Sequence, residues 1–132
     1  MLTTVYRIEN KDGYGPYTSM ECFPALRKMR DKHNANLNRW PTACSSDILN
    51  ALVRAKLAFS DCCCGFTSLR QLTEWFDSDD LGVLFDCNFR LAMYEVESAF
   101  IVYTEEQILF IRKQADLVCF MDIVDIYDLI KE

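Results

Sequence analysis

Apolar and β-branched residues recur with two different periods along the chain. Residues 3–9 alternate crudely between polar and apolar positions and are rich in β-branched and aromatic side chains, which predicts a first strand. A dense turn signal, Asp-Gly-Tyr-Gly-Pro at 12–16, follows it. Residues 24–34 and 47–58 instead place apolar side chains at helical spacing, so we expect an amphipathic helix in each range.

A helix start is predicted at Thr67 or Ser68. Thr67 or Ser68 is a good N-cap, and Gln71, three residues after Ser68, completes the sequence of a reciprocal capping box, so we expect a helix over 68–77. The acidic group at 77–80 favours a short helical turn over 81–85, because carboxylates interact favourably with a helix N-terminus. After it, strands are predicted at 89–97, 100–103, 106–112 and 117–121.

These elements predict an α+β fold: one twisted, mainly antiparallel sheet with the helices at 24–34, 47–58 and 68–77 packed against it. A chain of 132 residues is long enough to bury a core of its own, and we expect a single globular domain over 1–132. No apolar run is long enough for a membrane span, and the first residues do not have the pattern of a signal peptide. We therefore expect a cytoplasmic protein.

Seven cysteines are an odd number, and Cys62, Cys63 and Cys64 are consecutive, which no ordinary disulfide framework favours. The other four are scattered and His33 is the sole histidine, so we expect reduced core thiols and no metal site. A single histidine also argues against Ser-His or Cys-His nucleophilic catalysis.

Charge is divided unevenly along the chain. Residues 1–76 carry a net charge of +3 and residues 77–132 a net charge of −9. Direct binding to nucleic acid needs clustered Lys and Arg, so this distribution favours a protein partner with a basic surface instead. The acidic candidates for partner binding are Glu105, Glu106, Asp116, Asp122, Asp125 and Asp128. The last three recur every three positions and would share one face of a helix; the alternative is an ordinary solvated helix face.

Three places could carry chemistry, and each has a simpler structural explanation. Arg7 on the first strand could reach a pocket, or it could pair with Glu9 or another acid. The corner at 65–68 could bind an anion at a helix N-terminus, or Ser68 could only cap the helix. A carboxylate of Glu105 or Glu106 could stabilise a cation near Arg7, or both could be exposed turn acids.

Three parts of the chain form a recognisable set: the Tyr-Arg-Ile-Glu strand with its Gly-Pro turn, the Cys-Gly-Phe-Thr-Ser-Leu corner, and the late strands around Tyr94 and Gln107. Together they resemble a family of small uncharacterised phage and prophage proteins. Proteins of this kind include inhibitors of bacterial defence systems, among them the anti-CRISPR proteins, many of which are acidic and act by binding. The resemblance implies a protein of the host-cell cytoplasm that inhibits or modulates a host defence or nucleic-acid-handling complex without a cofactor.

The order of the same segments also resembles the ADP-ribosyltransferase fold. That resemblance implies NAD as cofactor and a site formed by Arg7, Ser68 and Glu106 or Gln107. The chain departs from the pattern because it has no histidine on the first strand, and Gln107 cannot ionise. The leading hypothesis is therefore a non-enzymatic binding protein, and the alternative is an NAD-dependent ADP-ribosyltransferase or a degenerate transferase fold used for binding.

Overall fold

The computed structural model describes residues 1–16, 26, 28, 29, 52–54, 56, 62–103 and 107–130. Its strands are β1 (Leu2–Glu9), β2 (Cys62–Gly65), β3 (Arg90–Glu97), β4 (Ile101–Tyr103), β5 (Ile108–Ile111) and β6 (Ala115–Met121). Its helices are α3 (Leu69–Trp75), α4 (Ser78–Asp86) and α5 (Ile126–Ile130), with short 3-10 turns η2 (Ser98–Phe100), η3 (Arg112–Gln114) and η4 (Ile123–Asp125). The α+β class and the antiparallel pairing expected from the sequence are confirmed.

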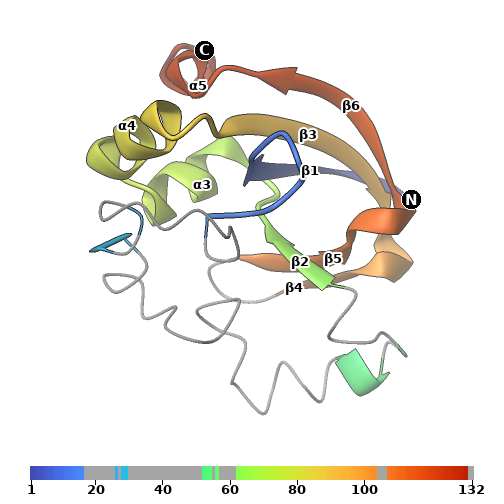
Figure 1. The fold of residues 1–132 in the computed structure, drawn as a ribbon. Helices are drawn as coiled ribbons and strands as arrows, with labels where there is room; N and C mark the ends of the chain where they lie inside the picture. The colour runs from blue at the N-terminus through green and yellow to red at the C-terminus, as the bar shows by residue number, and fades with distance from the viewer. Residues whose placement is uncertain are drawn as a thin grey trace.

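The described strands form two sheets where the sequence pattern suggested one. One sheet has the order β1-β3-β6 and the other β2-β5-β4 (Figure 1). They are linked by a single bridge, in which Tyr6 N donates to Phe66 O at 2.7 Å and Phe66 N donates to Tyr6 O at 2.8 Å. The pairing stops there because the chain turns away into α3, which begins three residues after Phe66. Each sheet is consequently a small unit that needs the other to cover its face.

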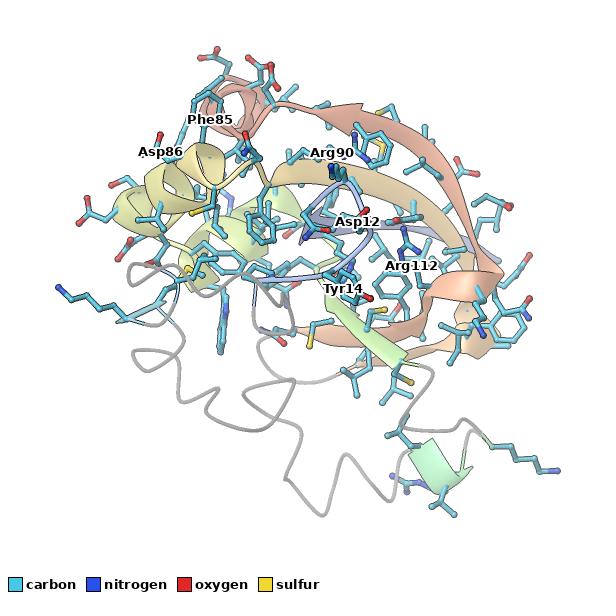
Figure 2. The ribbon with its side chains drawn as sticks, in the orientation of Figure 1. Asp12, Tyr14, Phe85, Asp86, Arg90 and Arg112 are labelled. Carbon is cyan, nitrogen blue, oxygen red and sulfur yellow. The ribbon has the colours of Figure 1, made fainter. Side chains whose placement is uncertain are left out.

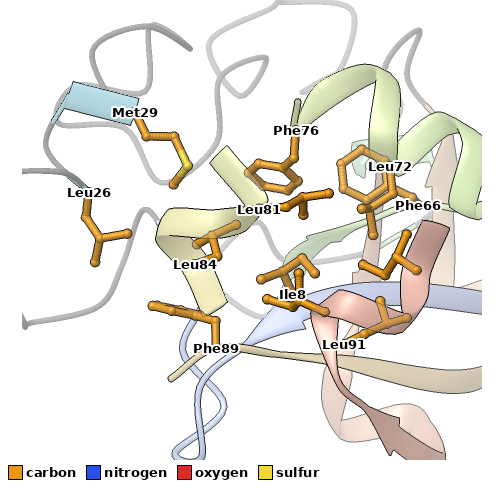
Figure 3. Packing of buried hydrophobic residues seen from close by; sticks show 12 residues of the cluster. Ile8, Leu26, Met29, Phe66, Leu72, Phe76, Leu81, Leu84, Phe89 and Leu91 are labelled. Atoms are coloured by element: carbon orange, nitrogen blue, oxygen red, sulfur yellow. The ribbon is translucent and has the colours of Figure 1, made fainter. Parts of the chain in front are cut away.

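Three hydrophobic clusters are buried among the described residues, and two of them hold these layers together; the third, on the β2-β5-β4 sheet, contains Leu52, Cys62, Val102, Leu109 and Ile111. The first lies between the two sheets and contains Val5, Tyr94, Ile108 and Phe110, all at most 3 % exposed. The second lies between the β1-β3-β6 sheet and the helices α3, α4 and α5 (Figure 3). Its labelled members are Ile8, Leu26, Met29, Phe66, Leu72, Phe76, Leu81, Leu84, Phe89 and Leu91. Successive side chains of a strand point to opposite faces, so β1 and β3 serve both cores.

Local capping signals explain where two helices begin. Ser68 caps α3 as expected, because its side-chain oxygen accepts a hydrogen bond from Gln71 N at 3.0 Å. The Gln71 side chain returns to Thr67 N at 3.1 Å, one residue before the cap. Asp77 and Asp80 form the full reciprocal box at the start of α4, which makes a nine-residue helix where only a short turn was expected.

The late strands were also well placed by the sequence pattern. Every boundary of β3, β4, β5 and β6 lies within two residues of the predicted one. The helices predicted over 24–34 and 47–58 lie largely outside the described residues. Within those ranges Leu26, Met29 and Leu52 are described, and all three are buried in the cores.

Candidate functional site

The acidic residues proposed for partner binding lie on one continuous segment. We call residues 115–129 the β6–α5 edge; it runs along β6, through η4 and into α5 (Figure 1). Asp116, Asp122, Asp125 and Asp128 are all exposed there, and the edge contains no Lys or Arg. Glu105 and Glu106, the other two acidic candidates, lie outside the described residues. The four acidic candidates that the structure describes thus lie together on one side of the molecule.

The same edge exposes large apolar side chains. They are Leu117, Val118, Phe120, Val124, Tyr127 and Leu129, each between 38 and 57 % exposed. Among the described strands β6 pairs only with β3, so its other edge presents unpaired backbone N–H and C=O groups. A register shift opposite Met93 and Tyr94 leaves Val118 without a partner on β3. An exposed apolar strand edge of this kind is a site at which another chain can pair.

The end of the edge is fixed to the body of the protein at α5. Ile123 and Ile126 are buried in the core beneath the helices, while the aspartates beside them stay in solvent. Burial, together with the charges of the Asp77 and Asp80 carboxylates, raises the pKa of Tyr127. This end of the edge is therefore anchored in the core by its isoleucines, with its aspartates in solvent.

The residues suggested for a transferase site have structural partners instead. Ser68 is occupied as the cap of α3, and Gln107 is only 1 % exposed. Arg7 is 7 % exposed and pairs with Glu9, as the simpler explanation had it, with 3.7 Å between Arg7 Nε and Glu9 Oε1. Glu106 lies outside the described residues. The transferase site stays a prediction, without a geometric argument for it in the part of the chain that is described.

Arg7 is held by backbone as well as by charge. Its Nη1 donates to Cys64 O at 2.9 Å and its Nη2 to Gly13 O at 3.3 Å. Through these contacts one arginine ties β1 to β2 and to the turn that follows β1. Gly15 lies so close that an added Cβ would stand 3.1 Å from Arg7 Nη2. The glycines of the turn therefore allow its backbone to lie directly over the guanidinium.

A buried charged cluster surrounds Glu9, and the sequence pattern gave only its first pair. Glu9 is 1 % exposed and accepts hydrogen bonds from the Tyr94 hydroxyl and, at 3.0 Å, from Arg112 Nη2. Arg112 Nε also donates to the Tyr94 hydroxyl at 3.2 Å. We call Arg7, Glu9, Tyr94 and Arg112 the Glu9 cluster. Tyr94 and Arg112 could not be connected to Glu9 from spacing, since they are 85 and 103 residues away along the chain.

The cluster alters the proton affinity of its members. Burial, with the hydrogen bond to Glu9 and the charge of Glu9, raises the pKa of Tyr94 to about 12. For Arg112, burial acts to lower the pKa, but the charge of Glu9 and the hydrogen bonds to Glu9 and Tyr94 outweigh it and raise the pKa. Both shifts favour a neutral phenol and a charged guanidinium around the carboxylate.

We expect Tyr94 to be among the last tyrosines to ionise in the folded protein. Its folded pKa of about 12 is above the ordinary value of 10, so the stability it contributes is complete below pH 10 and is lost as the pH rises through 12. Ultraviolet titration of the native protein and of Tyr94→Phe should give a difference spectrum with a midpoint near pH 12. When both proteins are unfolded in guanidinium, the midpoint of the difference titration should fall near pH 10. A midpoint near pH 10 in the folded proteins would contradict the prediction.

The consecutive cysteines lie on β2, paired with β5. Burial raises the pKa of the Cys64 thiol, and the positive charge of Arg7 opposes this only in part. A thiol with a raised pKa is a poor nucleophile at neutral pH, which favours a packing role for Cys64. Within the residues that the structure describes, no group of three or more His, Cys, Asp or Glu side chains could hold a metal ion.

The fold and the edge describe a small α+β protein with an acidic, partly apolar surface, and comparison with known families identifies it as a phage protein. The family model for the bacteriophage T4 Y00F protein matches residues 1–124, so the chain belongs to that family. The expected phage family is confirmed; the match does not extend to anti-CRISPR proteins or ADP-ribosyltransferases. No curated protein and no solved structure gives a significant match. None of the helices in the described part of the chain has the length and apolar character needed to cross a bilayer.

Proposed function

We propose that this phage protein binds a host protein or protein complex through the β6–α5 edge and modulates its activity in the host cytoplasm. The observation that carries the proposal is the coincidence of an unpaired strand edge, exposed apolar side chains and four exposed aspartates on one segment of the described chain. Apolar and aromatic side chains supply most of the affinity of an interface, while charges set its orientation and association rate.

The chemistry of the edge specifies the kind of partner. An unpaired strand edge binds an extended segment by adding it to the sheet, with backbone hydrogen bonds for affinity and side-chain contacts for specificity. Because the edge has aspartates and no cation, the complementary segment carries Lys or Arg. Such segments are common on proteins that handle nucleic acid, so inhibition of a defence complex in the manner of anti-CRISPR proteins fits the surface.

Reversing the charge of the edge should weaken this binding. The variant Asp122→Lys, Asp125→Lys, Asp128→Lys changes only exposed side chains, so we expect nearly unchanged thermal stability and at least about tenfold weaker capture of the partner. The matched control is Asp12→Lys, Glu74→Lys, Asp86→Lys, which alters the net charge equally at exposed positions outside residues 115–129.

The measurement is quantitative affinity capture from lysate of the phage's host, followed by mass spectrometry and by binding of the purified partner. A partner retained by the native protein and the control, lost from the edge variant, and released as salt rises supports the proposal. If the native protein, the edge variant and the control variant recover the same proteins equally, the β6–α5 edge does not bind the partner. Because the partner is scored for ADP-ribose in the same spectra, the enzymatic alternative is tested in the same experiment.

A further inference from the structure

Strand β6 lies between a basic turn and an acidic one. The turn η3, directly before β6, carries the exposed side chains of Arg112 and Lys113. Directly after β6, the exposed side chains of Asp122 and Asp125 belong to the segment that forms η4. Figure 2 shows Arg112 toward the beginning of β6, whereas α5 follows the other end of the strand. The two ends of the free edge of β6 therefore carry opposite charges.

The irregularity in β6 places two of its large apolar side chains on one face. Leu117 pairs with Tyr94 of β3, and Phe120 pairs with Ala92. These partners are two residues apart on β3 and share a face of the sheet, so Leu117 and Phe120 share that face as well. Residues three apart point to opposite faces of a regular strand, and the extra residue Val118 removes that difference. Leu117 is 47 % exposed and Phe120 is 38 % exposed.

A second copy of β6 matches this pattern when the two strands run antiparallel. With a two-fold axis between Val118 and Cys119, Leu117 of each copy lies directly opposite Phe120 of the other. The same register brings the basic start of each strand to the acidic end of the other, whereas a parallel pair would place the aspartates of both copies together. Strand β6 also has no Pro or Lys, the residues that commonly prevent pairing at a sheet edge.

Charge sets the direction of such a pair, and apolar contact supplies its strength. Lys113 makes no ion pair with any residue that the structure describes, but Arg112 is already paired with Glu9. The four exposed aspartates of the edge outnumber these two cations, so the facing ends attract each other without full neutralisation. The affinity comes from burial of the exposed apolar side chains of β6 and from backbone hydrogen bonds between the two unpaired edges.

We propose that β6 pairs antiparallel with β6 of a second copy, so that the free protein is a two-fold symmetric dimer in which this edge is covered. The β1-β3-β6 sheets of the two copies then form one continuous sheet. A host segment that adds to β6 has to displace the second copy, so dimerisation regulates the binding of the host partner. This regulation rests on the proposed function, whereas the dimer does not.

The first test is sedimentation of the purified protein over a range of concentrations, which we expect to show a reversible dimer. Leu117→Lys should raise the dissociation constant of the dimer at least about tenfold, because it puts a charge on the paired edge. Leu2→Lys is the matched control, since Leu2 is 53 % exposed but lies on β1, and it should dimerise like the native protein. Circular dichroism checks that both variants are folded. A protein that is monomeric at every concentration, or an equal effect of the two variants, would overturn the proposal.

A charge exchange tests the direction of the pair. Lys113→Glu should weaken the dimer about threefold, as expected for a partly exposed charge contact, and adding Asp125→Lys should restore it. The matched control adds Glu74→Lys, at an exposed position of α3, to Lys113→Glu. It has the same net charge as the restored variant and should stay weakened. Equal recovery in both double variants would show that net charge alone acts, and the antiparallel pair would be wrong.

Cys119 tests the register independently of affinity. Its α-carbons in the two copies would lie about 6 Å apart across the axis, within reach of a disulfide. Mild oxidation should therefore give a covalent dimer that Cys119→Ser abolishes and Cys87→Ser, at another partly buried free cysteine, leaves intact. Absence of a product that depends on Cys119 would overturn the proposal. It would leave the proposed function standing, because capture of the host partner is measured separately with the edge variant.

Discussion

Replacing Glu9 by alanine should lower the free energy of unfolding by about 3–5 kcal/mol, the usual cost of removing one partner of a buried ion pair. The carboxylate is 1 % exposed and is the only acid in contact with Arg7 and Arg112 within the described residues. Without it, the buried guanidinium of Arg7 keeps its backbone partners but loses its counter-charge, and the Tyr94 hydroxyl loses its acceptor. Chemical denaturation followed by circular dichroism measures the change.

The chain contains a matched control for this experiment. Glu97 pairs with the N-terminal amine at 2.9 Å, but its side chain is 54 % exposed and that of Met1 is 92 % exposed. Glu97→Ala should therefore cost less than about 1 kcal/mol, as surface pairs do. Glu9→Gln keeps the shape and an acceptor oxygen, so it should fall between the two. Equal costs for Glu9→Ala and Glu97→Ala would show that the Glu9 cluster does not stabilise the fold.

The comparison between these two glutamates also shows what sequence pattern can and cannot predict. The pairing of Arg7 with Glu9 follows from the alternation of β1, because residues two apart on a strand share a face. Their burial does not follow, since it depends on β3 bringing Tyr94 and on η3 bringing Arg112 from the far end of the chain. Charged residues in an alternating strand are ordinarily exposed, so the pattern alone suggested a surface pair.

The starts of two helices were predictable because their capping signals are local. Ser68 and Asp77 act on backbone groups within three residues of themselves, and such signals survive in any tertiary context. The division of the strands into two sheets depends instead on one bridge, Tyr6 with Phe66, between distant segments. The β6–α5 edge was half predictable. The spacing of Asp122, Asp125 and Asp128 was visible in the sequence, whereas the unpaired edge of β6 beside them required the topology.

That bridge is the basis of the second large effect, which we expect from Gly65→Ala. An added Cβ would stand 2.8 Å from Val5 Cγ1 and 3.0 Å from Phe110 Cε1, in the core between the sheets. It would also stand 3.1 Å from Tyr6 O, which accepts the hydrogen bond from Phe66 N. Relief by a backbone shift would weaken the bridge, and relief by side-chain movement would disturb a core in which Phe110 is 0 % exposed. Overpacking of this kind costs about 2–3 kcal/mol.

Gly82→Ala is the matched control, because it adds the same methyl group where nothing lies within 4 Å. Gly82 is exposed within α4, so alanine should raise the free energy of unfolding by about 0.5–1 kcal/mol through helix propensity. Denaturant midpoints of the two variants should thus move in opposite directions from that of the native protein. A Gly65→Ala protein as stable as the native one would show that the core between the sheets and the bridge at Phe66 accept an added methyl group without cost, and the prediction would be wrong.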